Sequence, residues 1–206
     1  MAKNATGKIV AKVCDGGRGK AFTPKDFLTL TSHETARQAL ARLAKEGTIR
    51  RVMRGVYDYP RYSSFLNAPS PADPDAIAHA IARNHGWSIV PTGDTALNLL
   101  GVSTHVPAQW VYLSDGPAKQ YEWEGGKITF KHRTNKETSR LSPKTALVVQ
   151  ALKRLGKERV DESVVHALRS KLDAKDRARA AREARYATSW VYEVIRQLAE
   201  GKAPDA

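Results

Sequence analysis

The chain has 206 residues, 41% of them hydrophobic, which is enough to build a folded core in one large domain or two small ones. No apolar run reaches the length of a membrane-spanning helix, Met1–Lys8 lacks the apolar core of a secretory signal, and a single cysteine excludes an internal disulfide framework, so we expect a cytoplasmic protein. The formal net charge of +13 is uneven: it is +8 over residues 1–62, zero over residues 63–140 and +5 over residues 141–206.

The first sixty residues predict three helices followed by a β-hairpin. A short first helix contains Cys14, which we expect to be a small core residue, a second begins near Thr23, and a third spans Thr31–Glu46. The hairpin Thr48–Tyr59 follows directly and is strongly basic. This order is that of a winged helix-turn-helix, and with the local charge it predicts that residues 1–62 form a domain that binds double-stranded DNA.

The third predicted helix has an apolar face and a polar face. Its apolar residues recur at steps of four and three, which is the stripe that packs on a core; they are Ala36, Leu40 and Leu43. We expect Thr31 to cap the helix, with Glu34 completing a capping box. Side chains able to bind base edges or phosphates lie at the helix start and on its opposite face, and the predicted DNA contacts here are Ser32, His33, Thr35, Gln38 and Arg42.

The hairpin adds a second group of predicted DNA contacts. Ile49 and Val52 are expected to be buried, and Gly55 allows the sharp turn at the tip. Three arginines are expected to project outward, where guanidinium groups can hold phosphates or enter the minor groove; they are Arg50, Arg51 and Arg54.

A proline-rich stretch, Tyr62–Pro74, marks the next boundary, because three prolines among small polar residues exclude a helix or a central strand. Beyond it, residues 63–140 predict a small α+β domain. Its expected elements are a helix capped by Asp73 that stops at Gly86, a strand Trp87–Val90, a helix from Thr92 closed by Gly101, a strand Trp110–Ser114, and a hairpin of Tyr121–Trp123 with Lys127–His132.

Residues 141–206 predict a helical region, either separate from the middle domain or continuous with it, because apolar residues recur at helical spacing over 142–155, 164–168 and 190–198. Asp173–Arg185 predicts a basic helix, which suits either a solvated helix with pairs such as Asp173 with Arg177 or a second contact with a polyanion. The fold class predicted for the whole chain is α+β: a winged helix-turn-helix, a small α+β middle domain and a helical C-terminal region.

Several of these motifs together resemble the AbiEi-type antitoxin family. The resemblance is carried by Phe22–Phe27, Ala36–Ile49, Arg54–Tyr57 and Pro91–Pro107, and it covers roughly residues 6–135. It implies the antitoxin of a type IV toxin–antitoxin pair, a winged-helix regulator that represses its own operon and counteracts a nucleotidyltransferase toxin of the AbiEii type. With the proline-rich boundary, it leads us to expect operator binding by residues 1–62 and toxin neutralisation by residues 63–206.

Two other functions stay open at this point. One is a winged-helix transcriptional regulator with a ligand-sensing domain, which a polar pocket in the middle domain would favour. The other is a nucleic-acid-processing enzyme built on Glu122, Glu124 and Lys127 with Asp115 nearby, although their spacing is not typical of nucleases. The six histidines include no pair at metal-ligand spacing, and no phosphate-binding loop occurs, so we expect no catalytic residue, cofactor or metal.

Overall fold

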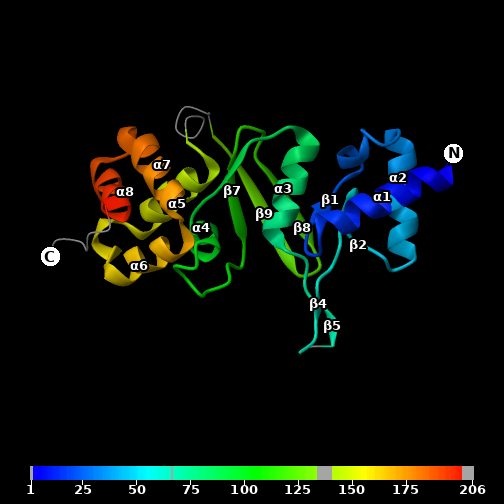
Figure 1. Ribbon diagram of the computed structural model, residues 1–206, viewed down its shortest axis with the longest axis horizontal. Helices are drawn as coiled ribbons and strands as arrows, with labels where there is room; N and C mark the ends of the chain where they lie inside the picture. Colours follow the sequence, from blue (N-terminus) through cyan, green and yellow to red (C-terminus); the bar gives the residue numbers. More distant parts are fainter. Residues whose placement is uncertain (1, 66, 134–140, 201–206) are drawn as a thin grey trace. The chain divides into compact units, whose positions relative to one another are not determined.

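The computed structural model of the chain describes residues 2–65, 67–133 and 141–200 (Figure 1). Helices and strands are mixed along the chain, which confirms the predicted α+β class. The fold divides into two compact units, Met1–Ser88 with Gln120–Ile128, and Ile89–Lys119 with Thr129–Ala206. No helix in the described ranges is long and apolar enough to cross a membrane.

The units divide the chain differently from the predicted domains. The helix that follows the proline-rich stretch belongs to the first unit, whereas the sequence places it in the middle domain. The other predicted boundary, after residue 140, lies outside the described residues. Whether residues 1–62 fold alone stays a prediction.

The first unit contains a three-stranded antiparallel sheet with helices packed on it. Its elements are α1 (Ala2–Gly16), β1 (Ala21–Phe22), the 3₁₀ helix η1 (Pro24–Phe27), α2 (His33–Lys45), β2 (Arg50–Met53), β3 (Val56–Asp58), β4 (Tyr62–Ser63), β5 (Ala68–Pro69) and α3 (Pro74–His85). The strand order is β1-β3-β2, and β4 and β5 pair separately. Buried side chains of α1, η1 and α2 form one core, among them Ile9, Val13, Phe27, Leu40 and Leu43.

Three local expectations for this unit are wrong in detail. The second helix is only the 3₁₀ turn η1, in which the Thr23 backbone N–H donates to Asp26 at 2.8 Å. Helix α2 is capped by Ser32 rather than by Thr31, because the Ser32 hydroxyl accepts the Thr35 N–H at 3.2 Å. Cys14 is exposed, since it follows the buried Val13 by one residue and so lies a full 100° further round the helix.

A buried ion pair joins the two strands of the β2–β3 hairpin. Asp58 is only 2% exposed, and its carboxylate accepts Arg50 Nη2 at 2.6 Å and Nε at 3.0 Å. Arg50 Nη1 also donates to the Ser70 carbonyl at 3.0 Å, just ahead of α3. Arg50 therefore does not project outward as expected, because its guanidinium is committed to this internal contact.

The second unit is largely helical, as predicted for its C-terminal part. Its elements and those of the adjoining hairpin are β6 (Ile89–Pro91), α4 (Asp94–Leu99), β7 (Trp110–Ser114), β8 (Lys119–Trp123), β9 (Gly126–His132), α5 (Pro143–Leu155), η3 (Lys157–Arg159), α6 (Glu162–Lys171), α7 (Ala174–Glu183), η4 (Ala184–Tyr186) and α8 (Ser189–Glu200). The sheet order is β6-β7-β9-β8, which confirms the predicted hairpin. The core gathers α4, α5, α6 and α8 around residues such as Leu152, Leu168 and Ile195.

The ion pair generates a stability prediction. Asp58→Ala should lower the free energy of unfolding by about 3 kcal/mol, because it leaves the Arg50 charge without its partner; the value is at the low end for buried pairs since Arg50 keeps some access to water. Urea unfolding followed by circular dichroism measures it. The matched control, Arg51→Ala, removes a neighbouring exposed arginine and should change stability by less than about 0.5 kcal/mol. Equal values for the two variants would contradict a structural role for the pair.

Candidate nucleic-acid interface

Helix α2 presents a polar surface opposite its buried face. Ala36, Ala39, Leu40 and Leu43 are buried, so residues on the opposite side, including Gln38, face solvent. Four of the predicted contacts make hydrogen bonds within the protein. The Thr35 hydroxyl lies 2.9 Å from the Ser32 hydroxyl at the cap. Gln38 donates to Glu34 at 2.9 Å, and Arg42 donates to the Thr6 hydroxyl of α1. Gln38, His33 and Ser32 remain exposed.

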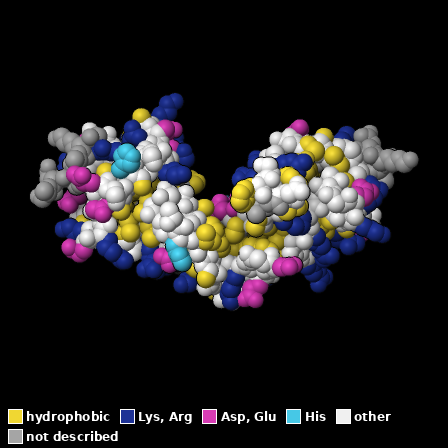
Figure 2. Space-filling model, turned by 90° about the horizontal axis from the view of Figure 1, so that it is seen from below, with side chains coloured by type: hydrophobic (Ala, Val, Ile, Leu, Met, Phe, Trp, Pro, Cys, Tyr) yellow, Lys and Arg dark blue, Asp and Glu magenta, His cyan; other side chains and the backbone are white. Residues whose placement is uncertain are grey.

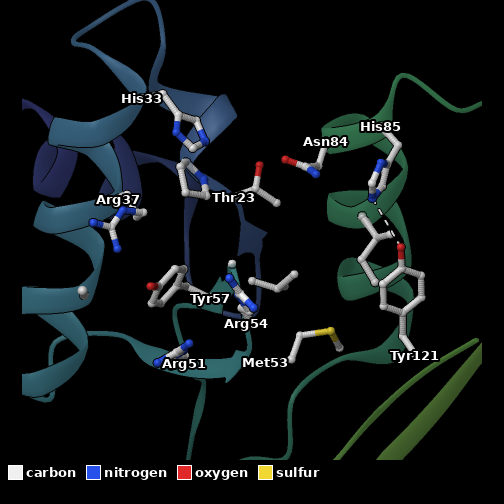
Figure 3. A pocket seen from close by; sticks show the side chains of 15 residues that line it. Thr23, His33, Arg37, Arg51, Met53, Arg54, Tyr57, Asn84, His85 and Tyr121 are labelled. Carbon is white, nitrogen blue, oxygen red and sulfur yellow. Dashed lines mark hydrogen bonds between the residues drawn. The ribbon is translucent and has the colours of Figure 1, made fainter.

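A hollow of about 600 Å³ lies beside α2 (Figure 3). One wall carries His33, Arg37 and Ala41 of α2, the β2–β3 hairpin contributes Arg51, Met53 and Arg54, and the far wall carries Asn84 and His85 of α3 with Tyr121 of β8. Figure 3 shows the arginines of the helix and of the hairpin on one side, facing the α3 residues across the space. The described residues that line it include three arginines and no acid.

The arginines of the hollow differ in how far their charge is compensated. Arg51 and Arg54 are exposed and form no ion pair with a described residue. Arg37 binds Glu34 through two hydrogen bonds, Nε to Oε2 at 2.9 Å and Nη2 to Oε1 at 2.6 Å. The hydrogen bond from Arg37, with a further one from Gln38 at 2.9 Å, lowers the pKa of Glu34 to about 2. The positive charge available to bind an anion is therefore mainly that of Arg51 and Arg54.

Several residues of the hollow were missed by the sequence analysis. Arg37 follows His33 by four residues and lies on the same side of the helix, a spacing that the sequence did offer. No spacing in the sequence indicated the residues of the far wall, because α3 and β8 are distant from α2 in the chain. There, the Tyr121 hydroxyl lies 3.3 Å from His85 Nε2, the His85 ring stacks on Trp87 at 4.5 Å, and Lys25 donates to the Asn84 carbonyl at 2.7 Å.

The residues weighed for catalysis do not assemble into a metal site. Lys127 pairs with Glu122 at 2.6 Å across the β8–β9 hairpin, so its ammonium is already compensated. Within the described ranges, no three His, Cys, Asp or Glu side chains gather closely enough to hold a metal ion. These contacts agree with the simpler interpretation of a solvated hairpin.

The acids at the start of helix α7, the predicted basic helix, are bound by other groups of the protein. Asp173 caps the helix by accepting the Asp176 N–H at 2.7 Å, and Asp176 itself pairs with Lys144 of α5. Arg177 donates to the Leu172 carbonyl at 2.6 Å, so the predicted pair with Asp173 is replaced by a contact with the backbone. Figure 2 shows a face of the molecule on which cations and acids are mixed. The described lining of the hollow beside α2 differs from that face, because it contains arginines and no acid.

Comparison with known proteins gives a family without an assigned activity. The sequence pattern described as "Family of unknown function (DUF6088)" matches residues 8–179, and the chain belongs to this family. No curated protein matches the chain in sequence. Among solved structures, the crystal structure of the RV2827C protein from Mycobacterium tuberculosis is similar with a TM-score of 0.42 and 15% identity, covering 98% of this chain and 78% of that one. Similarity of this degree does not establish a common fold.

The Glu34–Arg37 contact generates a titration prediction. In carbon-13 NMR, the Glu34 carboxyl should titrate near pH 2, and Arg37→Ala should move the midpoint up toward the ordinary value of 4.5, because the Arg37 hydrogen bond is the largest cause of the lowered pKa. The pair therefore contributes fully above about pH 4.5 and is lost as the pH falls through about 2. Lys45→Ala, on the same helix, should leave the midpoint unchanged. A midpoint near 4.5 in the unaltered protein would show that the contact does not persist in solution.

Proposed function

We propose that this member of the DUF6088 family is a sequence-specific DNA-binding transcriptional repressor that reads its operator through an N-terminal winged helix-turn-helix. One observation carries the proposal: His33 and Arg37 of α2 and two exposed arginines of the β2–β3 hairpin, Arg51 and Arg54, border one hollow whose described lining contains no acid. A helix edged by guanidinium groups matches the needs of duplex DNA, in which base edges lie between phosphate rows.

The order of elements supports the winged-helix assignment. Helix α1, the short turn η1 and helix α2 precede the β2–β3 hairpin, and β1 completes the small sheet. In this assignment α2 is the recognition helix and the hairpin is the wing. Leu40 and Leu43 hold α2 on the core, so that its other side is available to a major groove.

The contacts within the first unit divide the predicted residues into two groups. Gln38, His33 and Ser32 are exposed on α2 and are proposed to meet base edges or phosphates, while Arg51 and Arg54 of the wing are proposed to hold phosphates. The others are proposed to position this surface rather than to touch DNA, because Thr35 is half-buried at the cap and the two arginines are bound to other elements; they are Thr35, Arg42 and Arg50.

The proposal has a second and more specific part, which is that this repressor is also an antitoxin. It is supported by the resemblance of residues 6–135 to AbiEi-type antitoxins, which implies a neighbouring nucleotidyltransferase toxin and autoregulation of the operon. Such a repressor would act in the cytoplasm, where its operator lies. It would need no cofactor, metal or catalytic residue of its own.

The experiment that tests DNA binding is a titration of the full chain against the DNA directly upstream of its own coding sequence. Arg51→Ala with Arg54→Ala should weaken binding to this DNA and to random duplex alike. The slope of log affinity against log salt should fall by about 0.9 for each lost phosphate contact. Binding measured by fluorescence anisotropy at several salt concentrations gives both quantities.

A matched variant separates base reading from phosphate binding. Gln38→Ala should cost roughly 1–3 kcal/mol on the upstream DNA and much less on random duplex, with the salt slope unchanged. If the unaltered chain binds upstream and random DNA equally, sequence-specific repression is ruled out. An unchanged salt slope in the double arginine variant would remove the wing from the interface.

The antitoxin role is tested separately, by co-expression with the product of the adjacent gene from an inducible promoter. The full chain should restore growth, and the double arginine variant should restore it equally, because residues 63–206 are proposed to carry neutralisation. Repression of a reporter fused to the upstream DNA should fail in that variant. If the unaltered chain does not restore growth, the antitoxin proposal is wrong and the DNA-binding proposal is unaffected.

A further inference from the structure

A short β-hairpin projects from the first unit between the wing and α3, and we call residues 59–72 the finger; Leu66 within it lies outside the described residues. Its strands β4 and β5 pair Tyr62 with Pro69 and Ser63 with Ala68. Near its tip, the Phe65 side chain is 95% exposed, which is unusual for a large apolar group because it forgoes the stabilisation that burial would give. Phe65 is therefore accessible to a ligand.

The finger is held in shape by its own residues. Asn67 adopts a left-handed backbone with φ of 46°, and its side-chain oxygen accepts the Tyr62 hydroxyl across the hairpin. Prolines at positions 60, 69 and 71 restrict the backbone on both sides of the pair of strands. Phe65 is thus presented on a restrained turn rather than on a loose loop.

The base of the finger is fastened to the wing and to the loop before β1. The Ser70 N–H donates to the Arg61 carbonyl at 2.7 Å, and the Ser70 carbonyl accepts Arg50 of the buried ion pair. On the other side, the Gly19 N–H donates to the Tyr59 carbonyl at 2.6 Å. Arg61 packs so closely on Gly19 that a side-chain carbon at position 19 would collide with its guanidinium. The buried ion pair therefore fixes the finger as well as the wing.

The base of the finger is also cationic. A hollow of about 320 Å³ lies there, lined by Arg18 and Arg61 together with Gly47 and Thr48 at the C-terminal end of α2. Arg18 is positioned by a bond to the Pro60 carbonyl at 2.9 Å and by the Tyr59 ring at 4.4 Å. No acidic residue occurs anywhere from position 59 to position 72.

The two cationic hollows border different parts of α2. The hollow beside the wing takes in His33, Arg37 and Ala41 along one side of the helix, whereas the hollow at the finger takes in Gly47 just beyond its last residue. A duplex that contacts α2 could therefore meet the cations of both hollows through its phosphates.

We propose that the finger is a second DNA-contacting element, in which Phe65 enters the minor groove as an apolar wedge while Arg18 and Arg61 hold phosphates at its base. Minor-groove proteins use this pairing, an apolar side chain inserted between base steps beside basic residues that bind the backbone. The inference rests on the proposed function, because it needs a duplex seated on α2.

Duplex DNA fits the finger better than a protein partner does. A protein hot spot is an anchor surrounded by further contacts that exclude water. The finger offers Phe65 and Tyr62, which is 57% exposed, with the small polar Ser63 and Ser64 between them. A wedge between base pairs needs only one planar side chain and positive charge behind it. Both are present, and the charge has the sign that DNA requires.

The test compares Phe65→Ser with the unaltered full chain by hydroxyl-radical footprinting, which reads the minor groove, on the DNA directly upstream of the coding sequence. We expect the unaltered chain to protect a minor-groove segment on one flank of the site, and Phe65→Ser to lose that flank alone. Affinity should fall roughly tenfold, as for loss of one stacked aromatic, with thermal stability unchanged because the side chain touches almost nothing. Phe65→Trp should retain both protection and affinity.

The matched control is Val106→Ser, which removes another exposed apolar side chain, 69% exposed, and should change neither footprint nor affinity. An unchanged footprint and affinity in Phe65→Ser would overturn the inference while DNA binding stands. Loss of growth rescue by Phe65→Ser with its footprint intact would overturn it too, and would assign the finger to a protein partner. Absence of any DNA binding by the unaltered chain would instead defeat the proposed function itself.

Discussion

The buried pair of Arg50 with Asp58 is the contact on which the arrangement of the first unit depends. A carboxylate that is 2% exposed is tolerated only if a cation and further donors compensate its lost hydration. Arg50 supplies both through two of its nitrogens, and with a third it binds Ser70. One guanidinium thus joins β2 to β3 and both to the chain leading into α3. Because the guanidinium is planar and holds its donors at fixed angles, it fixes the relative orientation of these segments, which the single ammonium group of a lysine could not do.

The Arg50–Asp58 pair also shows what could not be predicted from the sequence alone. In the sequence, Arg50, Arg51 and Arg54 look equivalent, since each is an arginine in a short basic hairpin. Only the strand register distinguishes them, because it places Arg50 opposite Asp58, eight residues further on. Local periodicity predicted α2, α5, α6 and α8 correctly, since apolar spacing alone specifies them. It failed for η1, because a segment as short as Pro24–Phe27 has too few apolar positions to distinguish a helix from the single 3₁₀ turn that a capping box closes.

The far wall of the hollow beside α2 escaped prediction for a different reason. Asn84, His85 and Tyr121 come from α3 and β8, which the sequence assigns to a separate middle domain. Their proximity to α2 follows from tertiary contacts such as Arg83 with Asp26 at 3.0 Å, which span more than fifty residues. Such a pair has no signature in spacing or composition. A single sequence can therefore indicate the charged edge of a candidate DNA site, but not the opposite wall that shapes it.

The charges around α2 suit discrimination better than mere attraction. If every cation were free, the surface would bind any duplex strongly, because phosphate contacts carry no sequence information. Glu34 compensates Arg37 and also holds Gln38, the exposed residue best suited to read adenine. In the proposed DNA complex, the Glu34 carboxylate would lower affinity for every duplex, because Gln38 would have to leave it in order to bind a base. Only the correct base would compensate for this loss, and the difference would give specificity.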